Sequence, residues 1–313
     1  MSAAPGQATP VAAPQRGWTG WAMALSASLT FSIATPIARG AITSGVPPIQ
    51  FLVMRIVLAA VLMGATLALF DRAHLRADAR CIRISWLAGT VNALGMLGYF
   101  RGLQTLESSM ASMLIAISPL VVLTMLALRG ERVTYRHAVR LVLALTGVYL
   151  LIGPGGDVDM GGVLWIVGSL FCFALQLSLL QWYLLAYDAR TVTFDGLFAM
   201  SVGVVAMWGL EGSGWQALGM WGWAAVVVLA VLSTYISRLL LFAAVSRIGG
   251  GQMAMLSPVE TLLSVIWSML FLGERLSLVQ WAGGLLILFS AVLAIQRLSI
   301  ARFRPRWRMW AKS

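Results

Sequence analysis

The sequence predicts an all-α, polytopic membrane protein, and two observations lead to this prediction. Of the 313 residues, 60% are hydrophobic and only 11% are charged, whereas an ordinary globular chain carries roughly 25% charged residues. Because a soluble fold needs a polar exterior, most of this surface must face hydrocarbon. The apolar residues also form long runs that mostly lack period-2 alternation, which favours helices over a membrane β-barrel.

The apolar runs are long enough to serve as membrane spans. A helix needs about 20 apolar residues to cross roughly 30 Å of hydrocarbon. Ten transmembrane helices are expected, at residues 18–38, 47–70, 84–104, 108–129, 136–153, 161–186, 193–211, 218–246, 250–272 and 276–296. The first run is too long for the core of a signal peptide, so we expect it to be retained.

Two short segments flank the apolar part of the chain. Residues 1–17 are rich in Ala, Pro, Gln and Ser, which bury too little apolar surface to become ordered, so we expect a disordered tail. Residues 298–313 are expected to form a basic cytoplasmic tail, whose aromatic and basic side chains also suit contact with anionic lipid.

The net charge of +11 would indicate nucleic-acid binding in a soluble protein, but here its distribution encodes orientation. With the N-terminus inside the cell, 17 of the 22 Lys and Arg residues lie in cytoplasmic segments, and the external turns hold only Arg39 and Arg275. The positive-inside rule therefore predicts that both termini are cytoplasmic. The expected partners are membrane lipid and a small-molecule solute, with no nucleic acid and no obligate protein partner.

Cysteine and histidine usage indicates neither a cofactor nor a metal site. Cys81 and Cys172 are far apart in the sequence, and His74 and His137 lie in short charged stretches between apolar runs. These residues match no zinc-binding or disulfide pattern, so we expect no metal and no disulfide framework.

An internal repeat divides the chain into two halves, 18–153 and 161–297. The pentapeptide at 130–134, Gly-Glu-Arg-Val-Thr, recurs in similar form at 273–277, and a Ser-Pro pair precedes each copy, at Pro119 and at Pro258. Each half holds five expected spans. Because five is odd, the second half must enter the membrane in the opposite sense, and such inverted five-helix repeats are typical of secondary transporters.

These features resemble the EamA family of the drug/metabolite transporter superfamily. The resemblance covers residues 18–297 and includes Pro47, Pro48 and Arg55 in the second expected helix and the segment Tyr99-Phe-Arg-Gly-Leu at 99–103. It implies a ten-helix basket that exports or exchanges small metabolites, with amino acids among the solutes of characterised relatives. It also implies a location in the inner membrane of a bacterial cell.

Three charged residues inside the apolar runs are candidates for solute binding. An ionised side chain in hydrocarbon costs at least ~2.5 kcal/mol unless it faces a partner or a wet cavity, so Arg55, Arg238 and Glu260 should point inward. Arg55 suits a carboxylate or phosphate, and Glu260 could couple protons. The alternatives are that Arg55 braces neighbouring helices, that Arg238 snorkels to the interface, and that Glu260 forms a static ion pair or hydrogen bond.

Four further residues could orient a ligand near the middle of the membrane. Asn92, Gln176 and Tyr235 supply hydrogen-bonding groups, and Trp267 offers a stacking surface. Such residues can also simply bond across helices. The pairs Gly98/Gly102 and Ser264/Ser268 have the small-xxx-small spacing of packing faces, so we expect helices to approach closely there.

The prolines and the repeated glutamates have both structural and mechanical interpretations. Pro119 and Pro258 each remove a backbone donor, and the resulting kinks are candidate hinges. Glu131 and Glu274 follow glycines at expected helix ends, where capping or an interfacial salt bridge accounts for them without a part in transport.

The function predicted from the sequence is a secondary transporter of small metabolites that works by alternating access. More arginines than acidic residues lie within the spans, which favours an anionic or zwitterionic solute over a cation. An integral membrane enzyme acting on lipid-linked substrates is an alternative, but the sequence shows no membrane-depth nucleophile, base or metal motif for it. A channel or a lipid scramblase is the other alternative.

Overall fold

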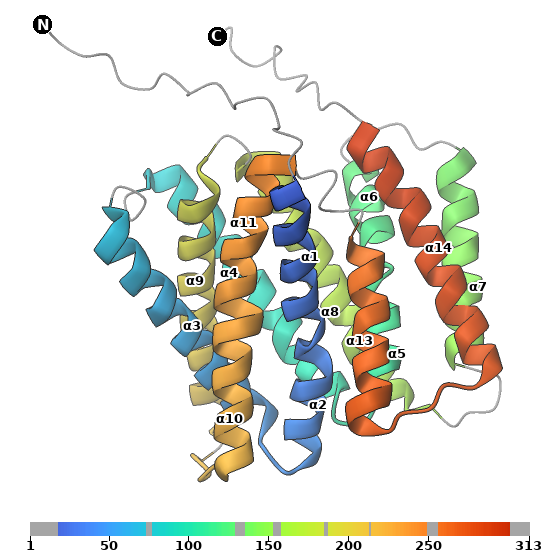
Figure 1. The fold of residues 1–313 in the computed structure, drawn as a ribbon, viewed down its shortest axis with the longest axis horizontal. Helices are drawn as coiled ribbons and strands as arrows, with labels where there is room; N and C mark the ends of the chain where they lie inside the picture. The colour runs from blue at the N-terminus through green and yellow to red at the C-terminus, as the bar shows by residue number, and fades with distance from the viewer. Residues whose placement is uncertain are drawn as a thin grey trace, which may run out of the picture.

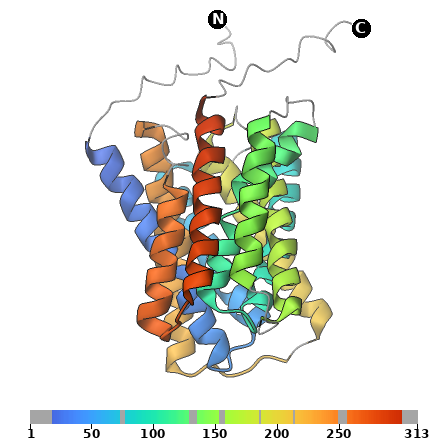
Figure 2. The same ribbon diagram turned by 90° about the vertical axis from the view of Figure 1, so that its right-hand side faces the viewer.

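The computed structural model describes residues 18–72, 77–128, 135–152, 158–184, 187–212, 214–248 and 256–300. Within these ranges every regular element is a helix and none is a strand, which confirms the all-α prediction. The helices stand side by side in one bundle, with the start of α1 and the end of α14 at the same end (Figures 1 and 2). We call this the termini end and the opposite end the distal end.

The first half contains seven helical segments. They are α1 (Trp18–Ser32), α2 (Ala34–Thr43), α3 (Pro48–Phe70), α4 (Ala79–Gly102), α5 (Ser108–Ile115), α6 (Ser118–Leu128) and α7 (Tyr135–Ile152). The expected disordered tail at 1–17, and the first copy of the repeated pentapeptide at 130–134, lie outside the described residues.

The second half contains both α-helices and π-helical stretches. It comprises α8 (Met160–Leu179), the π-helical turn η2 (Leu180–Leu184), α9 (Ala189–Glu211), α10 (Met220–Val228), the π-helix η3 (Leu229–Ile236), α11 (Ser237–Ile248), α13 (Ser257–Leu272) and α14 (Leu278–Ile300). The α14 helix runs past the expected end of its span, and most of the basic tail lies outside the described residues.

Length and composition identify several of these segments as membrane spans. Five are long and apolar enough to cross a membrane, namely Trp18–Thr43, Pro48–Phe70, Met160–Leu179, Arg190–Glu211 and Met220–Leu241. Shorter apolar helices include Ser108–Val122, Val139–Ile152, Ser257–Leu272 and Leu278–Leu293. Large apolar side chains such as Leu69, Leu164 and Leu270 are about two-thirds exposed or more, as expected of a surface that faces lipid. The chain is an integral membrane protein.

Side chains and glycines at the helix ends account for several boundaries. The carboxylates of Asp78, Asp159 and Asp188 accept hydrogen bonds from backbone N–H groups at the starts of α4, α8 and α9, as N-cap residues do. Gly212 and Gly273 follow α9 and α13 with φ of 63° and 67°. Glycine adopts this left-handed conformation without a steric penalty, so the chain can turn there.

Two expected spans are interrupted, and one boundary prediction is wrong. The first span breaks at Ile33 and then continues to Thr43, so Arg39 lies within α2 and not in an external turn. Its guanidinium donates to the backbone carbonyls of Leu103 and Leu106, and protein partners therefore replace water around this charge.

The two candidate hinge prolines occupy similar places. The fourth span breaks between α5 and α6, and Pro119 is the second residue of α6. Pro258 is the second residue of α13, where a missing N–H leaves no helical bond unmade. The α13 helix therefore begins next to Pro258, at Ser257. Residues 249–255, which precede it, lie outside the described part of the chain. Hinge motion at either proline stays a prediction.

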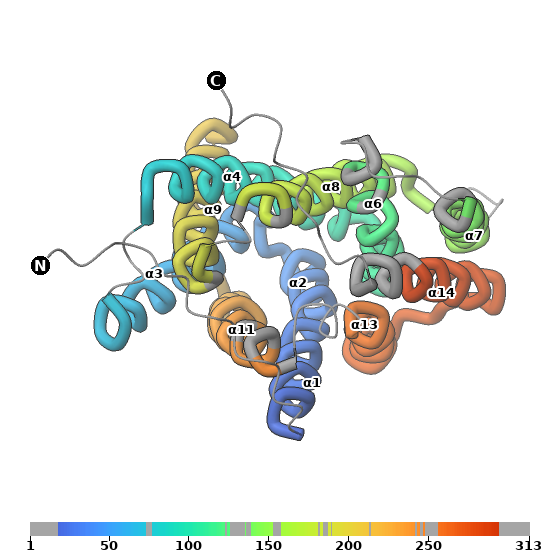
Figure 3. Tube along the Cα trace, turned by 90° about the horizontal axis from the view of Figure 1, so that it is seen from above, coloured from blue at the N-terminus to red at the C-terminus, as the bar shows by residue number. Residues whose placement is uncertain are grey.

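Helices of the two halves pack closely against each other. The helix pairs α4–α8, α4–α9, α7–α14 and α1–α11 make extensive contacts (Figure 3). A Cβ added at Gly98 would lie 2.9 Å from Ser169 Oγ, and one at Gly102 would lie 2.6 Å from the Ile166 side chain. The glycines therefore permit the close approach of α4 to α8, which confirms the predicted packing face.

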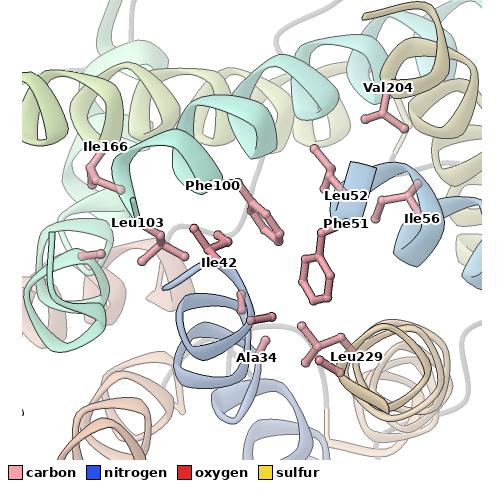
Figure 4. Packing of buried hydrophobic residues seen from close by; sticks show 14 of the residues in the cluster. Ala34, Ile42, Phe51, Leu52, Ile56, Phe100, Leu103, Ile166, Val204 and Leu229 are labelled. Carbon is pink, nitrogen blue, oxygen red and sulfur yellow. The ribbon is translucent and has the colours of Figure 1, made fainter. Parts of the chain in front are cut away.

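A group of buried apolar side chains lies in the distal half of the bundle. Phe51 and Phe100 have ring centroids 5.8 Å apart, and both side chains are no more than 1% exposed. Ile42, Leu52 and Leu229 surround them (Figure 4). This cluster brings together the end of α2, the start of α3 and the end of α4, so it closes the centre of the bundle on the distal side.

Candidate functional site

A cavity of about 270 Å³ lies between the two halves of the chain. Its walls come from the first half, through α1 to α5, and from the second half, through α8, α9, η3, α11 and α13. Five of the residues predicted to bind solute line it, namely Arg55, Asn92, Gln176, Arg238 and Glu260. Arg55, Arg238 and Glu260 therefore face the interior of the bundle, as the sequence predicts.

Arg55 is fixed in place by hydroxyl groups of the second half. The residue is 3% exposed. Its Nε donates to Thr234 Oγ1 at 3.0 Å, and its Nη2 donates to Ser233 Oγ at 3.3 Å. Because these acceptors are neutral, the positive charge of Arg55 is oriented by them but is not neutralised. The brace between helices that remained an alternative for Arg55 is therefore present, and it leaves a cationic group on the cavity wall.

The π-helix η3 positions these two hydroxyls. Thr234 Oγ1 donates to the carbonyl of Leu229, five residues earlier, at 3.0 Å while it accepts from Arg55. In a π-helical stretch the bonds join residues five apart instead of four, so the following side chains are rotated around the helix axis. Ser233 and Thr234 thereby face α3, and both are buried.

Arg238 and Glu260 line the same cavity without pairing with each other. Arg238 Nε is buried and has no hydrogen-bond partner among the described residues. The ion pairs within the described ranges join Arg39 to Glu274, Arg101 to Glu211 and Arg190 to Asp71, and none joins Glu260 to an arginine of the cavity. A static pair of Glu260 with Arg55 or Arg238 is therefore not what this structure contains.

The cavity continues toward the termini end of the bundle. A second pocket of about 60 Å³ shares Asn92, Gln176, Met200 and Arg238 with the cavity and extends to Ser85 and to the start of α9. The Nδ2 atom of Asn92 lies 3.4 Å from Met200 Sδ, a weak interaction that leaves most of the amide's bonding capacity for other groups.

Several lining residues were not predicted as site residues. Tyr99 shares a hydrogen bond of 2.9 Å with Thr35, and its ring lies 6.3 Å from that of Phe173. Phe31 and Phe100 add further aromatic surface to the cavity. Ser233 and Thr234 are adjacent hydroxyl residues in an apolar run, and this pattern could have marked them as site residues. The face of the helix that they occupy, however, depends on η3.

Two predicted site residues lie elsewhere. The Tyr235 hydroxyl is 2.5 Å from Thr66 Oγ1, and Trp267 donates from Nε1 to Ser32 Oγ at 3.1 Å while it stacks on Phe271 at 5.4 Å. Neither residue lines the cavity. Each of the two side chains lies on a face of its helix that contacts a neighbouring helix, beside the residues that line the cavity.

No metal site is apparent in the described ranges, where no group of three or more His, Cys, Asp and Glu side chains could hold an ion. Gln181 and Gln252 are polar residues of the sixth and ninth expected spans, and their side chains lie outside the described part of the chain.

Comparison with known proteins relates both halves to a transporter family. The sequence model of the EamA-like transporter family matches residues 18–153 and again residues 160–296. A protein of Archaeoglobus fulgidus named as an uncharacterized transporter is 27% identical over 65% of this chain and 73% of its own length. The inner membrane transporter YicL of Salmonella typhimurium, also named uncharacterized, is 25% identical over 70% of this chain and 73% of its own.

A solved crystal structure has the same fold. It matches with a TM-score of 0.63 at 18% sequence identity, over 89% of this chain and 98% of the other. The arrangement of helices is therefore shared with an experimentally determined protein.

Proposed function

Because the chain belongs to the EamA-like transporter family, we propose that it is a secondary transporter of small zwitterionic or anionic solutes, such as amino acids, that exports or exchanges them. The chain is a membrane transporter and not an enzyme, as its family and its relatives indicate. The proposal concerns the class of solute, the direction of transport and the transport mechanism.

One observation carries the choice of solute. Arg238 and Glu260 lie on different helices, α11 and α13, and face one cavity without forming an ion pair with each other. Burying an ion without a partner is costly, so a ligand that brings both opposite charges lowers the free energy of the loaded state. A zwitterion does this, with its carboxylate at Arg238 and Arg55 and its ammonium group at Glu260.

The remaining walls favour an apolar substituent on the solute. Phe31, Phe100 and Phe173 contribute aromatic surface to the cavity, together with Met96 and Ile115. Burial of an apolar side chain against them contributes about 25 cal/mol per Å² of area removed from water. A volume of about 270 Å³ suits a small metabolite.

The location of the cavity supports alternating access. It lies between two halves that match the same family model, and transporters built from inverted repeats bind solute at such an interface. In this proposal all ten expected helices span the inner membrane with both termini in the cytoplasm. The cavity then faces the cytoplasm, because the second pocket extends toward the termini end.

Counterflow in proteoliposomes tests the proposal. Vesicles containing the purified chain are loaded with an unlabelled mixture of amino acids, and entry of labelled amino acids is measured for the native chain, Arg238→Met and Glu260→Gln. The expected result is saturable, trans-stimulated uptake by the native chain and a loss of about tenfold or more in each variant. Glu211→Gln removes an exposed carboxylate of the distal end and serves as the matched control, with uptake unchanged.

Two results would contradict the proposal. Uptake that neither saturates nor responds to internal solute indicates a channel or a scramblase. Equal uptake by the native chain and by both folded cavity variants would show that Arg238 and Glu260 take no part in transport.

A further inference from the structure

The carboxylate of Glu274 connects the two halves at the distal end. Its Oε1 accepts hydrogen bonds from Ser108 N at 2.8 Å and from Ser108 Oγ at 2.9 Å. Its Oε2 accepts from Ser109 N at 2.9 Å and from Ser109 Oγ at 2.6 Å. Arg39 Nε lies 3.5 Å from Oε1. Glu274 is 8% exposed, so one buried carboxylate of the second half is held by α2 and α5 of the first.

Glu274 serves as the N-cap acceptor that α5 lacks. The residue at the N-cap position of α5, Glu107, makes no capping hydrogen bond through its side chain. The free N–H groups of a helix N-terminus need acceptors and carry partial positive charge, which favours an anion there. Helix capping and an interfacial salt bridge are the two roles that the sequence predicts for Glu274. The side chain makes both contacts, but the capped helix belongs to the other half.

A line of serine hydroxyls continues from Glu274 to the cavity. Ser108 Oγ lies 2.7 Å from Ser268 Oγ, and one turn further along both helices Ser112 Oγ lies 2.8 Å from Ser264 Oγ. Ser112 and Ser264 line the cavity. The contact between α5 and α13 is therefore polar along its length from the distal surface to the solute site, as the small-residue spacing of Ser264 and Ser268 predicted for a packing face.

We propose that this α5–α13 seam is the distal gate of the transporter and that Glu274 is the latch that holds it shut. The proposal rests on the proposed function, because only a carrier with alternating access has to open the distal end. Solute leaves the cavity between α5 and α13 when the Glu274 carboxylate withdraws from Ser108, Ser109 and Arg39.

The chemistry of the seam allows repeated opening. The polar groups that lose a partner on opening are hydroxyls, amides, a carboxylate and a guanidinium, all of which water can hydrate once the seam separates. A polar surface pocket of about 480 Å³, lined by Arg39, Glu107, Glu274 and Arg275 among others, lies next to the latch and gives water access to it. The α7–α14 contact differs, because a Cβ at Gly283 would lie 2.6 Å from the Gly147 carbonyl oxygen. That contact is fixed by close backbone packing.

Distances between spin labels on the two sides of the seam test the latch without any solute. Cys81 and Cys172 are replaced by alanine, and labels are attached to cysteines at Gln104, in the exposed turn before α5, and at Leu270, which is 67% exposed on α13. Double electron–electron resonance in nanodiscs then gives the distance distribution. In Glu274→Gln, we expect the ratio of the longer-distance population to the shorter one to rise about tenfold.

Matched variants decide the outcome. Glu211→Gln removes the same charge at the same end from an exposed ion pair with Arg101, and the distribution is expected to stay native. Ser108→Ala combined with Ser109→Ala retains the carboxylate and the backbone bonds, and a smaller shift in the same direction is expected. This double variant replaces Glu274→Gln as the deciding measurement if the latter fails to fold.

Two results overturn the latch. One is a native distance distribution in folded Glu274→Gln, or in the double serine variant where it decides. The other is an equal shift in Glu211→Gln, which assigns the effect to charge alone. If the chain exchanges solute but Glu274→Gln leaves the spin-label distances unchanged, the latch is refuted and the proposed function stands. A chain that opens when Glu274 is changed but exchanges no solute refutes the proposed function.

Discussion

The two ends of the bundle are held together by polar contacts of different kinds. At the distal end, the buried carboxylate of Glu274 receives four hydrogen bonds from Ser108 and Ser109 and lies close to Arg39. At the termini end, Arg190 and Asp71 form an ion pair of 2.6 Å whose side chains are 54% and 27% exposed. Both contacts connect the first half to the second, and burial is what distinguishes them.

This difference explains why the cavity extends toward one end. Water competes for exposed ion pairs, which contribute about 0–1 kcal/mol, so the Arg190–Asp71 pair holds its two helices together only weakly. The distal end combines the buried latch with the apolar cluster around Phe51 and Phe100. The second pocket accordingly runs toward the termini end.

Removing the latch carboxylate should produce the largest change in stability. Glu274→Ala leaves the N–H groups of α5 without their acceptor and Arg39 without its ion-pair partner, and breaking a buried pair in this way costs roughly 3–5 kcal/mol. Arg190→Ala at the termini end should cost about 0–1 kcal/mol. Unfolding in SDS, followed by circular dichroism, measures both. Equal losses for the two variants would show that burial does not distinguish the ends.

Replacing an arginine by lysine should show the same contrast in transport. Arg55→Lys keeps the charge but loses the fork that reaches Thr234 and Ser233, so we expect exchange at low solute concentration to fall about tenfold. Arg101→Lys changes a half-exposed arginine that pairs with Glu211, and exchange should be unchanged. Counterflow measures both variants, and a matching loss in Arg101→Lys would break the distinction.

The sequence predicted the fold class and the charged part of the site for a physical reason. Ionised residues in apolar runs must face protein or a cavity, and Arg55, Arg238 and Glu260 do so. Tyr235 and Trp267 carried no such constraint, since an aromatic residue with a polar atom is accommodated on several faces of a helix. The π-helix η3 then decided that Thr234 and not Tyr235 meets Arg55.

The latch lay beyond sequence reasoning because it depends on tertiary contacts. Glu274 and Ser108 are 166 residues apart, and nothing in the periodicity of either helix places them together. The repeated Gly-Glu-Arg motif marked Glu274 as a helix-end residue, which is correct. Which helix it caps is fixed by the packing of α13 against α5.

A hydroxyl of the gate should behave differently from an equally buried hydroxyl elsewhere. Ser268 on α13 and Ser290 on α14 are both fully buried and both donate to a backbone carbonyl. Each alanine substitution should cost about 1 kcal/mol of unfolding free energy. Only Ser268→Ala should raise the open population, by about fivefold, in the spin-label measurement. A similar rise in Ser290→Ala would place the moving seam elsewhere.

Acidity should give the smallest effect, through Glu107. Burial, and then the nearby Glu274 carboxylate, raise the pKa of Glu107, while Arg39 lowers it. An acid whose pKa is higher in the closed state than when hydrated disfavours closure when ionised, and this penalty disappears as pH falls through the raised pKa. The open population should therefore decrease as pH falls through that raised pKa toward the ordinary range of a glutamate. Spin-label distances over this range measure it, and Glu107→Gln should abolish the dependence.

The most direct test of the account compares solutes that differ only in charge. Counterflow is measured for phenylalanine, for its amide, which lacks the carboxylate, and for its deaminated acid, which lacks the ammonium group. Because Arg238 and Glu260 do not form an ion pair with each other, we expect rapid exchange of the zwitterion and at least about tenfold slower exchange of each analogue. In Glu260→Gln, the deaminated acid should then exchange faster than the zwitterion. Equal exchange of all three solutes by the native chain would contradict a cavity built around two opposite charges.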